Sequence, residues 1–210
     1  MKKKILLSSV LFVLLMLFLF LSVNSAKQNA IEHLNDRSRL TMKATYNAII
    51  DTYEVAAKKD FNSLMSSPKV LEILHTLKIT KNIKQRNLLR GELYRLLYKP
   101  YDMMQKMHMR QFQLHTDEGK SLLRMHLPYE SEDTLMDART SIRIANQEFK
   151  SVIGFEGGRV FPGFRYVYPI VDNGEHLGSV EFSISFEAIE DLIDKAMKEV
   201  RKQTSLRDFE

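Results

Sequence analysis

Two polar residues in the middle of the chain have the types and spacing needed to hold a small anion. Arg124 and His126 lie two residues apart in an alternating run, so both point to one face of a strand. A guanidinium can hold a carboxylate through two parallel hydrogen bonds, and a neighbouring imidazole can add a third. The sequence therefore predicts a carboxylate-binding site here. The alternative is an exposed strand face with an ordinary ion pair.

Four further candidates lie on two later predicted strands. Tyr166 and Tyr168 share one strand face, and their rings with hydroxyl tips suit either a ligand wall or the edge of a core. Arg165 points to the opposite face of that strand, so an ideal strand cannot line one pocket with all three. Glu181 lies on the polar face of the last strand, where it can bind a ligand amine or pair with an arginine. The candidate ligand-binding residues are Arg124, His126, Arg165, Tyr166, Tyr168 and Glu181.

Catalytic and metal chemistry find no support in the sequence. The chain of 210 residues has no cysteine, which excludes disulfides, thiolate metal sites and a cysteine nucleophile. The six histidines lack metal-binding spacing, and no Ser-His-Asp arrangement or GxSxG motif is present. The glycines within Gly154–Gly163 do not form a phosphate-binding loop. We therefore expect no enzyme activity, no metal and no cofactor.

Helical segments precede the strands. Residues 27–66 lack glycine and proline and carry apolar residues at near-helical spacing, which predicts a long amphipathic helix, with a break near Lys58–Asp60 as an alternative. A serine–proline pair predicts the N-cap and first residue of a short helix, Pro68–Leu77. A further helix is expected over Ile83–Tyr98, and Pro100 is expected to kink or restart it.

The middle of the chain changes from helical periodicity to alternation. Gln111–His115 and Ser121–Leu127 alternate with period two around a glycine-containing turn, which predicts a β-hairpin. Glu132–Phe149 is predicted to be a helix inserted after this hairpin. Arg139 and Arg143 are four residues apart on it, so they would share a face that is either solvated or closed over an anion.

Two longer strands complete the predicted sheet. Phe164–Val171 and Leu177–Phe186 flank an Asp-Asn-Gly-Glu turn, and a short strand among the preceding glycines brings the total to four or five. In the last strand serines and Glu181 alternate with apolar residues, so one face is core and the other faces water or a polar pocket. Glu187–Gln203 closes the chain as an amphipathic helix. This order of elements predicts an α+β fold with an antiparallel sheet.

The N-terminus has the pattern of a membrane anchor. Lys2–Lys4 precede an almost unbroken apolar run, Ile5–Val23, whose length as a helix is about 28 Å, close to the ~30 Å of a bilayer core. We predict an uncleaved signal anchor within residues 1–26. A cleaved signal peptide is the alternative, because small residues follow the run. The lysines stay cytoplasmic under the positive-inside rule, so residues 27–210 would lie outside the bacterial cell membrane.

The charge distribution argues against a nucleic-acid partner. The formal net charge is +5, and the three N-terminal lysines supply much of it. The remaining helical part is basic and the sheet part acidic, with no arginine-rich arm and no basic–aromatic ladder. We therefore expect no binding to nucleic acid.

Residues Phe112–Ile189 resemble the Cache family of extracytoplasmic sensor modules, in particular the double-Cache type of bacterial sensor kinases and chemoreceptors. The residues that carry the resemblance are Ser121–His126, Gly154–Arg159, Gly163–Ile170 and Gly174–Phe186. The resemblance implies a PAS-like sheet, and a small-molecule ligand such as an amino acid or carboxylate, bound between the sheet and its inserted loops. It also implies a helix that carries a signal across the membrane to a cytoplasmic output, and a second lobe.

The expected organisation combines these observations. Residues 1–26 would be the anchor and 27–210 the sensor, with a helical part over 27–108, a PAS-like sheet over 109–187 and an exit helix over 187–203. No second apolar span follows the sheet, so we expect either a fragment, a truncated product or a one-span protein that needs a partner. A homodimer formed through the long N-terminal helix is expected. The alternative function is a membrane-tethered dimerisation or protein-interaction module without a ligand.

Overall fold

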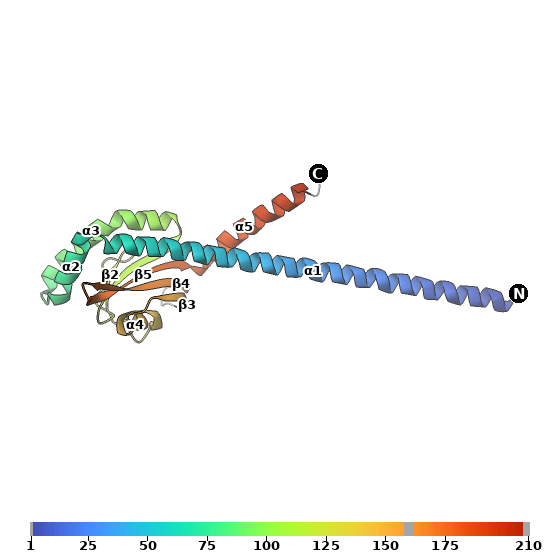
Figure 1. Cartoon of the computed structure of the whole chain (residues 1–210), viewed down its shortest axis with the longest axis horizontal. Coiled ribbons are helices and arrows are strands. Elements are labelled where there is room, and N and C mark those ends of the chain that lie inside the picture. The colour runs from blue at the N-terminus through green and yellow to red at the C-terminus, as the bar shows by residue number, and fades with distance from the viewer. Residues whose placement is uncertain (1, 158–161, 208–210) are drawn as a thin grey trace. The chain divides into compact units, whose positions relative to one another are not determined.

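The computed structural model describes residues 2–157 and 162–207, which form two compact units, Met1–Asn47 and Ala48–Glu210 (Figure 1). The first unit consists of the first part of helix α1, Lys2–Met65. Within the described residues this is the one helix long and apolar enough to cross a membrane, and its side chains from Leu11 to Val23 are all exposed. The helix is continuous in its second part, so the possible break near Lys58–Asp60 does not occur.

Two further helices follow α1 in the second unit. Helix α2, Pro68–Ile79, begins as predicted, because the side chain of Ser67 accepts a hydrogen bond from the backbone of Val70 at 3.4 Å. Helix α3, Ile83–Lys106, runs through Pro100 without ending there. A proline removes one helical hydrogen bond, but buried residues beyond it hold the last turns against the sheet.

The sheet has five strands, all antiparallel to their neighbours, in the order β2-β1-β5-β4-β3. The α+β prediction is therefore confirmed. The glycine-containing hairpin turn is confirmed between β1 and β2, and the Asp-Asn-Gly-Glu turn between β4 and β5. The strands are β1 (Met109–Thr116), β2 (Ser121–Arg124), β3 (Val152–Glu156), β4 (Gly163–Asp172) and β5 (Glu175–Ser185).

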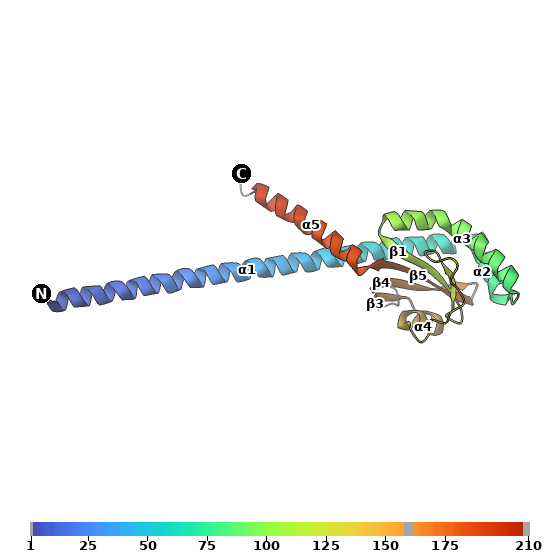
Figure 2. The same cartoon turned by 180° about the vertical axis from the view of Figure 1, so that it is seen from behind.

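One face of the sheet is an apolar core packed against the helices. Phe112 of β1 and Phe182 of β5 stack with ring centroids 5.1 Å apart, and Tyr101 of α3 lies beside Phe112. Helices α1, α2 and α3 lie on this side of the sheet, and α4 lies on the other (Figures 1 and 2). Alternation along each strand therefore sends apolar side chains toward α1–α3 and polar side chains toward α4.

The predicted inserted helix is less than half as long as expected. Helix α4 spans only Thr140–Gln147, so the prediction of a helix from Glu132 onward is wrong. The backbone N–H of Glu132 donates to Ser121 at 2.7 Å, and the N–H of Leu135 donates to Gly119 at 3.1 Å. This segment satisfies the exposed edge of β2, and that pairing replaces helical hydrogen bonds.

The polar face of the sheet is buried rather than wetted. Ser179, Glu181 and Ser183 of β5 have no exposed surface, although the alternation allowed for contact with water. The polar-pocket alternative is the one that fits, because α4 and the segment between β2 and α4 cover this face. Helix α5, Phe186–Arg207, continues directly from β5.

Candidate ligand-binding site

A cavity of about 410 Å³ lies on the polar face of the sheet. Its floor comes from β1 and β4, and its walls from the end of β2 and the segment that leads to α4. The lining residues are Gln111, Gln113, Arg124, His126, Leu127, Glu130, Asp133, Leu135, Ala138, Arg139, Gly157 and Arg165. Cavities of about 300–1,000 Å³ are the usual size for small-molecule sites, so this one has room for a small metabolite.

The floor of the cavity rests on a buried ion pair between two strands. Arg165 of β4 is 1 % exposed and donates to the carboxylate of Glu181 on the neighbouring β5. The same guanidinium donates to the side-chain oxygen of Gln111 at 2.6 Å, which also accepts from Ser183 at 3.1 Å. An arginine this deeply buried needs a carboxylate partner, and the strand register supplies one.

A second arginine extends this pair into a network. Arg139 donates to Glu181 at 2.7 Å and to Glu156 at 2.6 Å, and so joins two carboxylates. Glu156 also accepts from the backbone and the hydroxyl of Ser141, at 3.0 and 2.6 Å. The carboxylate of Glu156 therefore accepts from a backbone N–H in the first turn of α4, where the helix dipole favours a negative charge. The charged side chains beneath the cavity, Arg139, Glu156, Arg165 and Glu181, therefore all have partners of opposite charge.

The charges of the network hold its carboxylates ionised. Burial acts to raise the pKa of Glu181, but the charges of Arg139 and Arg165 outweigh it and keep that pKa below its ordinary value. Burial likewise acts to raise the pKa of Glu156, and the hydrogen bonds from Ser141 and Arg139 lower it overall. Glu181 is thus occupied by two arginines, as the ion-pair alternative for this residue anticipated.

The wall of the cavity carries groups of both signs that lie closer to solvent. Arg124 donates to the carboxylate of Asp133 at 2.8 Å and to the backbone oxygen of Glu130 at 3.1 Å. Burial and the charge of Arg124 lower the pKa of His126 to about 4, so its imidazole is neutral at pH 7. The Nδ1 atom of His126 is buried and has no hydrogen-bond partner among the described residues. These groups can offer donors to a carboxylate and acceptors to an ammonium.

Four of the six predicted ligand-binding residues meet at this cavity. Arg124, His126 and Arg165 line it, and Glu181 pairs with Arg165 from the neighbouring strand. Arg124 and His126 stay together although β2 ends at Arg124, so the predicted strand to Leu127 is too long.

The structure does not bring the two tyrosines to the cavity. Tyr166 is fully buried on the apolar face and donates its hydroxyl to the backbone oxygen of Ile50 at 2.9 Å. Tyr168 stacks on Phe61 of α1 at 5.0 Å between ring centroids, and the ammonium of Lys58 lies over its ring. Placing them in one site with Arg124 is therefore wrong, because the strand alternation turns them into the core.

Several residues of the cavity were not among the candidates. Arg139 was expected on a helix face with Arg143, but it precedes α4 in an extended conformation and is 8 % exposed, whereas Arg143 is exposed on the helix. Gln111 alternates with apolar residues in β1, and this pattern could have marked it. Asp133 carries no such signal, because its segment has no regular periodicity.

Part of the predicted glycine-rich motif lies outside the described residues. Gly157 lines the cavity, and Gly154 lies within β3. Gly158 and Arg159, which belong to the segment that carries the family resemblance, are not described.

Comparison with known proteins supports the sensory assignment. A family model described as "Double sensory domain of two-component sensor kinase" matches residues 39–207. No curated protein is similar to this chain at a significant level. Cache domains are sensory ligand-binding modules, so the predictions of a Cache-family sensor and of a chain that is not an enzyme are confirmed.

Solved structures share the fold at low sequence identity. The sensor domain of the V. cholerae histidine kinase DctB is 15% identical with a TM-score of 0.51, over 72% of this chain and 57% of that domain. The sensory domain of the Campylobacter jejuni chemoreceptor Tlp3 with isoleucine bound is 14% identical with a TM-score of 0.51, over 73% and 60%. The same receptor with L-norvaline gives 13% and 0.52, over 73% and 59%.

The chain covers only part of each of these solved domains. It spans less than two thirds of the length of each domain. The family match, in contrast, extends over most of the chain, from the middle of α1 to the last described residue of α5. The chain therefore belongs to the dCache_3 family of double sensory domains.

Proposed function

We propose that this chain is the membrane-anchored, extracytoplasmic ligand-sensing part of a bacterial signalling receptor, and that it binds a small carboxylate or amino acid. The observation that carries the proposal is the cavity of about 410 Å³ with Arg124 and Asp133 on one wall. A zwitterion presents one group of each sign, and this wall offers a partner for each. The sensory domain of the chemoreceptor Tlp3, which shares the fold, holds bound isoleucine, a ligand of the same class.

The buried network supports the proposal because it keeps the base of the cavity in one arrangement. Arg165 and Glu181 satisfy each other, so a ligand need not supply a partner for a buried charge. Arg124 and His126 lie nearer the opening and are the groups that a ligand can engage with little rearrangement. A preformed site of this kind binds with a smaller ordering cost.

Membrane anchoring through α1 is part of the proposal. The apolar side chains from Leu11 to Val23 are exposed along the whole segment, which water would not favour and a bilayer would. The lysines before this segment place the sensor outside. A cysteine at Ser38 should react with a membrane-impermeant maleimide in spheroplasts, and a cysteine at Lys3 should not. The chain has no other thiol. Labelling of the Lys3 variant alone would therefore show that the orientation is opposite to the proposed one.

A homodimer through α1 is also proposed. Ile31, Leu34 and Met42 follow the membrane segment, share one face of α1 and are between 46% and 63% exposed. Pairing of two such helices would cover these side chains. Sedimentation of the full chain in detergent should give a dimer, and polar substitutions at Leu34 and Met42 should give a monomer. A monomer at all concentrations would contradict this part.

The ligand itself is tested by thermal unfolding of the full chain against a panel of amino acids and small organic acids. A ligand at about 100 times its Kd adds roughly 2.7 kcal/mol of stability. For a domain of this size that is a shift in Tm of about 5–10 °C. Absence of any shift across the panel, together with a stable dimer, would favour the alternative of a tethered interaction module.

The position of the ligand is tested by substitution. Arg124→Gln removes the guanidinium of the wall and leaves the Arg165–Glu181 pair in place, so it should weaken binding of the ligand at least tenfold. Arg143→Gln is the matched control, because Arg143 is exposed and does not line the cavity. Equal affinity of the Arg124→Gln and unsubstituted chains would show that the ligand binds elsewhere.

A further inference from the structure

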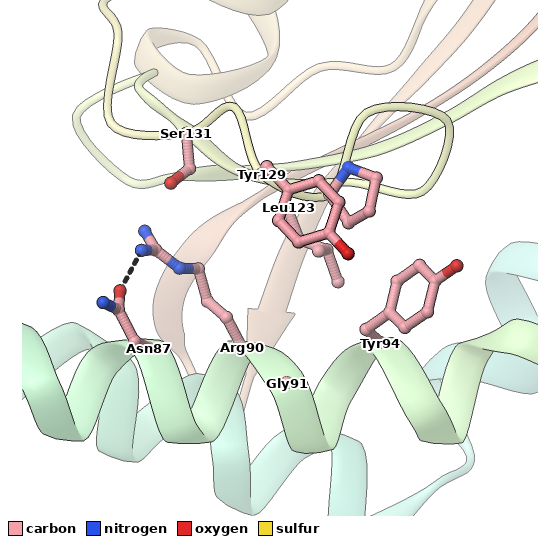
Figure 3. Close-up of a pocket in the computed structure, with 8 residues that line it drawn as sticks. Asn87, Arg90, Gly91, Tyr94, Leu123, Tyr129 and Ser131 are labelled. Atoms are coloured by element: carbon pink, nitrogen blue, oxygen red, sulfur yellow. Dashed lines mark hydrogen bonds between the residues drawn. The ribbon is translucent and has the colours of Figure 1, made fainter.

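A second cavity, of about 420 Å³, lies between α3 and the loop that follows β2 (Figure 3). It shares no lining residue with the first cavity. Its lining residues are Asn87, Arg90, Gly91, Tyr94, Leu123, Pro128, Tyr129 and Ser131. The proposed sensing of a small carboxylate or amino acid does not use any of them.

One face of α3 forms the wall of this cavity. Asn87, Arg90, Gly91 and Tyr94 follow the i, i+3, i+4, i+7 spacing that places residues on one side of a helix. Figure 3 shows Arg90 and Tyr94 rising from this helix toward the loop that carries Tyr129. The core residues Leu93 and Leu97 lie next to this face on the helix.

A glycine lies in the middle of this wall without a packing reason inside the chain. Gly91 is an interior helical position, where glycine is about 1 kcal/mol less favourable than alanine. A Cβ atom added there would meet nothing within 4 Å. The missing side chain therefore serves no close approach within the described chain, and its effect is to keep the wall of the cavity open.

The other wall presents aromatic and apolar surface. Tyr129 belongs to the loop and is 99% exposed, whereas Tyr94 belongs to helix α3 (Figure 3). Leu123 lies between them at the base and is buried. An aromatic side chain this exposed loses apolar contact that a ring-shaped ligand would restore.

The polar end of the cavity is lined by Arg90, which shares a carboxylate with Arg86 outside the cavity. Arg86 and Arg90 both donate to the same oxygen of Glu132, at 2.9 and 2.6 Å. Two guanidinium charges thus share one carboxylate. Arg90 also donates to the side-chain oxygen of Asn87, and these two bonds occupy two of its five N–H donors. A carboxylate ligand would give the two guanidinium groups a second anionic partner.

We propose that this cavity is a second ligand site, which takes an aromatic carboxylate. The ring lies against Tyr94 and Tyr129, and the carboxylate is bound by Arg90. The inference goes beyond the proposed sensing function, since it assigns a different chemical class to a different cavity. Each site can therefore fail its test independently.

The first test is a calorimetric titration of the full chain, in detergent micelles, with benzoate. Gly91→Leu fills the open wall and should weaken benzoate binding at least tenfold, which corresponds to about 1.4 kcal/mol. The substitution also replaces glycine by a strong helix former, so Tm should rise and unfolding cannot explain the loss. Gln85→Leu is the control, because it adds the same side chain at an exposed position of α3 outside the cavity.

The second test separates the charged end from the aromatic end. Arg90→Gln should weaken benzoate at least tenfold and leave benzyl alcohol unchanged, and Glu132 keeps Arg86 as a partner in this variant. Tyr129→Ala should weaken both compounds.

The proposal is overturned if benzoate shows no saturable binding at millimolar concentration, or if Gly91→Leu and Arg90→Gln bind it as well as the unsubstituted chain. Loss of benzoate binding in Arg124→Gln with retention in Gly91→Leu would place the compound in the first cavity and would also overturn it.

Discussion

Arg139, the residue immediately before α4, donates a hydrogen bond of 2.7 Å to Glu181 in the middle of β5. The two residues are 42 positions apart in the chain. The bond ties the segment that walls the cavity to the centre of the sheet, and Arg139 extends the tie to Glu156 on the edge strand β3. The shape of the candidate ligand site therefore depends on a buried charge network rather than on apolar packing alone.

Removal of the Arg139 guanidinium is expected to destabilise the fold strongly. Arg139→Met removes the close ion pair of Glu156, which keeps only an Arg165 nitrogen 3.9 Å away, and leaves Glu181 with Arg165 as its one arginine partner. Such a loss from a buried network costs about 3–5 kcal/mol. Urea unfolding of the full chain in detergent, followed by circular dichroism, measures the change. Arg143→Met on the exposed face of α4 is the control and should change the free energy of unfolding by less than about 0.5 kcal/mol. Equal effects of the two variants would contradict the role of the network.

Stability is expected to fall as the pH falls below neutrality. Burial lowers the pKa of His115 from 6.5 to about 4 in the folded chain. Between these values the unfolded chain binds a proton that the folded chain does not, so the free energy of unfolding decreases as the pH drops toward 4. The contribution of His115 is fully present above about pH 6.5 and amounts to roughly 3 kcal/mol.

His115→Gln tests this dependence. Glutamine can still bond Ser179, which lies 2.9 Å from Nδ1 of His115, but it cannot take up the proton. Urea midpoints measured between pH 4 and 6.5 should therefore vary less in this variant. His33→Gln, at an exposed position of α1, should leave the slope as it is in the unsubstituted chain. An unchanged slope in His115→Gln would exclude His115 as the source.

The two core tyrosines are expected to respond differently to loss of their hydroxyl groups. Tyr166→Phe removes a hydrogen bond to the backbone of Ile50 and should cost about 1 kcal/mol. The hydroxyl of Tyr168 is buried without a partner among the described residues, and burial raises its pKa to about 12. Tyr168→Phe should therefore be neutral or stabilising. The two free energies of unfolding give a direct comparison, and a greater loss in Tyr168→Phe would contradict the assignment.

One glycine of β5 is expected to tolerate no side chain. Gly178 has a φ of 139°, and a Cβ there would lie 2.0 Å from the backbone oxygen of His115. Gly178→Ala should therefore cost about 2–3 kcal/mol through strain and displacement of β1. Gly154→Ala in β3 has open space and should change stability by about 0.5 kcal/mol or less. Thermal unfolding of both variants tests the contrast. Equal values of Tm for the two variants would contradict the prediction.

Local patterns in the sequence predicted most of the elements. The Ser67–Pro68 start of α2, both hairpin turns and the alternation of β5 each depend on a few neighbouring residues, and all are found in the structure. The prediction of a helix from Glu132 was wrong because the structure of this segment depends on a contact with another part of the chain. Its first half pairs with the edge of β2, which is distant in the chain, and no local pattern records that pairing.

The candidate site was predictable where strand alternation determines it. Glu181 was placed on the polar face of its strand and Arg165 on the face opposite the two tyrosines, and the register of β4 and β5 then brings them into contact. Tyr166 and Tyr168 were placed on the opposite face correctly, but only the packing of α1 shows that this face is core. Asp133 was missed because irregular backbone gives its position no periodicity.

The sequence by itself determined the apolar N-terminal segment, the class of fold and the two faces of each strand, because these follow from composition and from periods of two and 3.6 residues. The tertiary structure alone decided which polar face is buried, that Arg139 joins two carboxylates from different strands, and that two separate cavities form. These features depend on contacts between segments far apart in the chain, and such contacts exist only once the sheet has assembled and its edges have been covered.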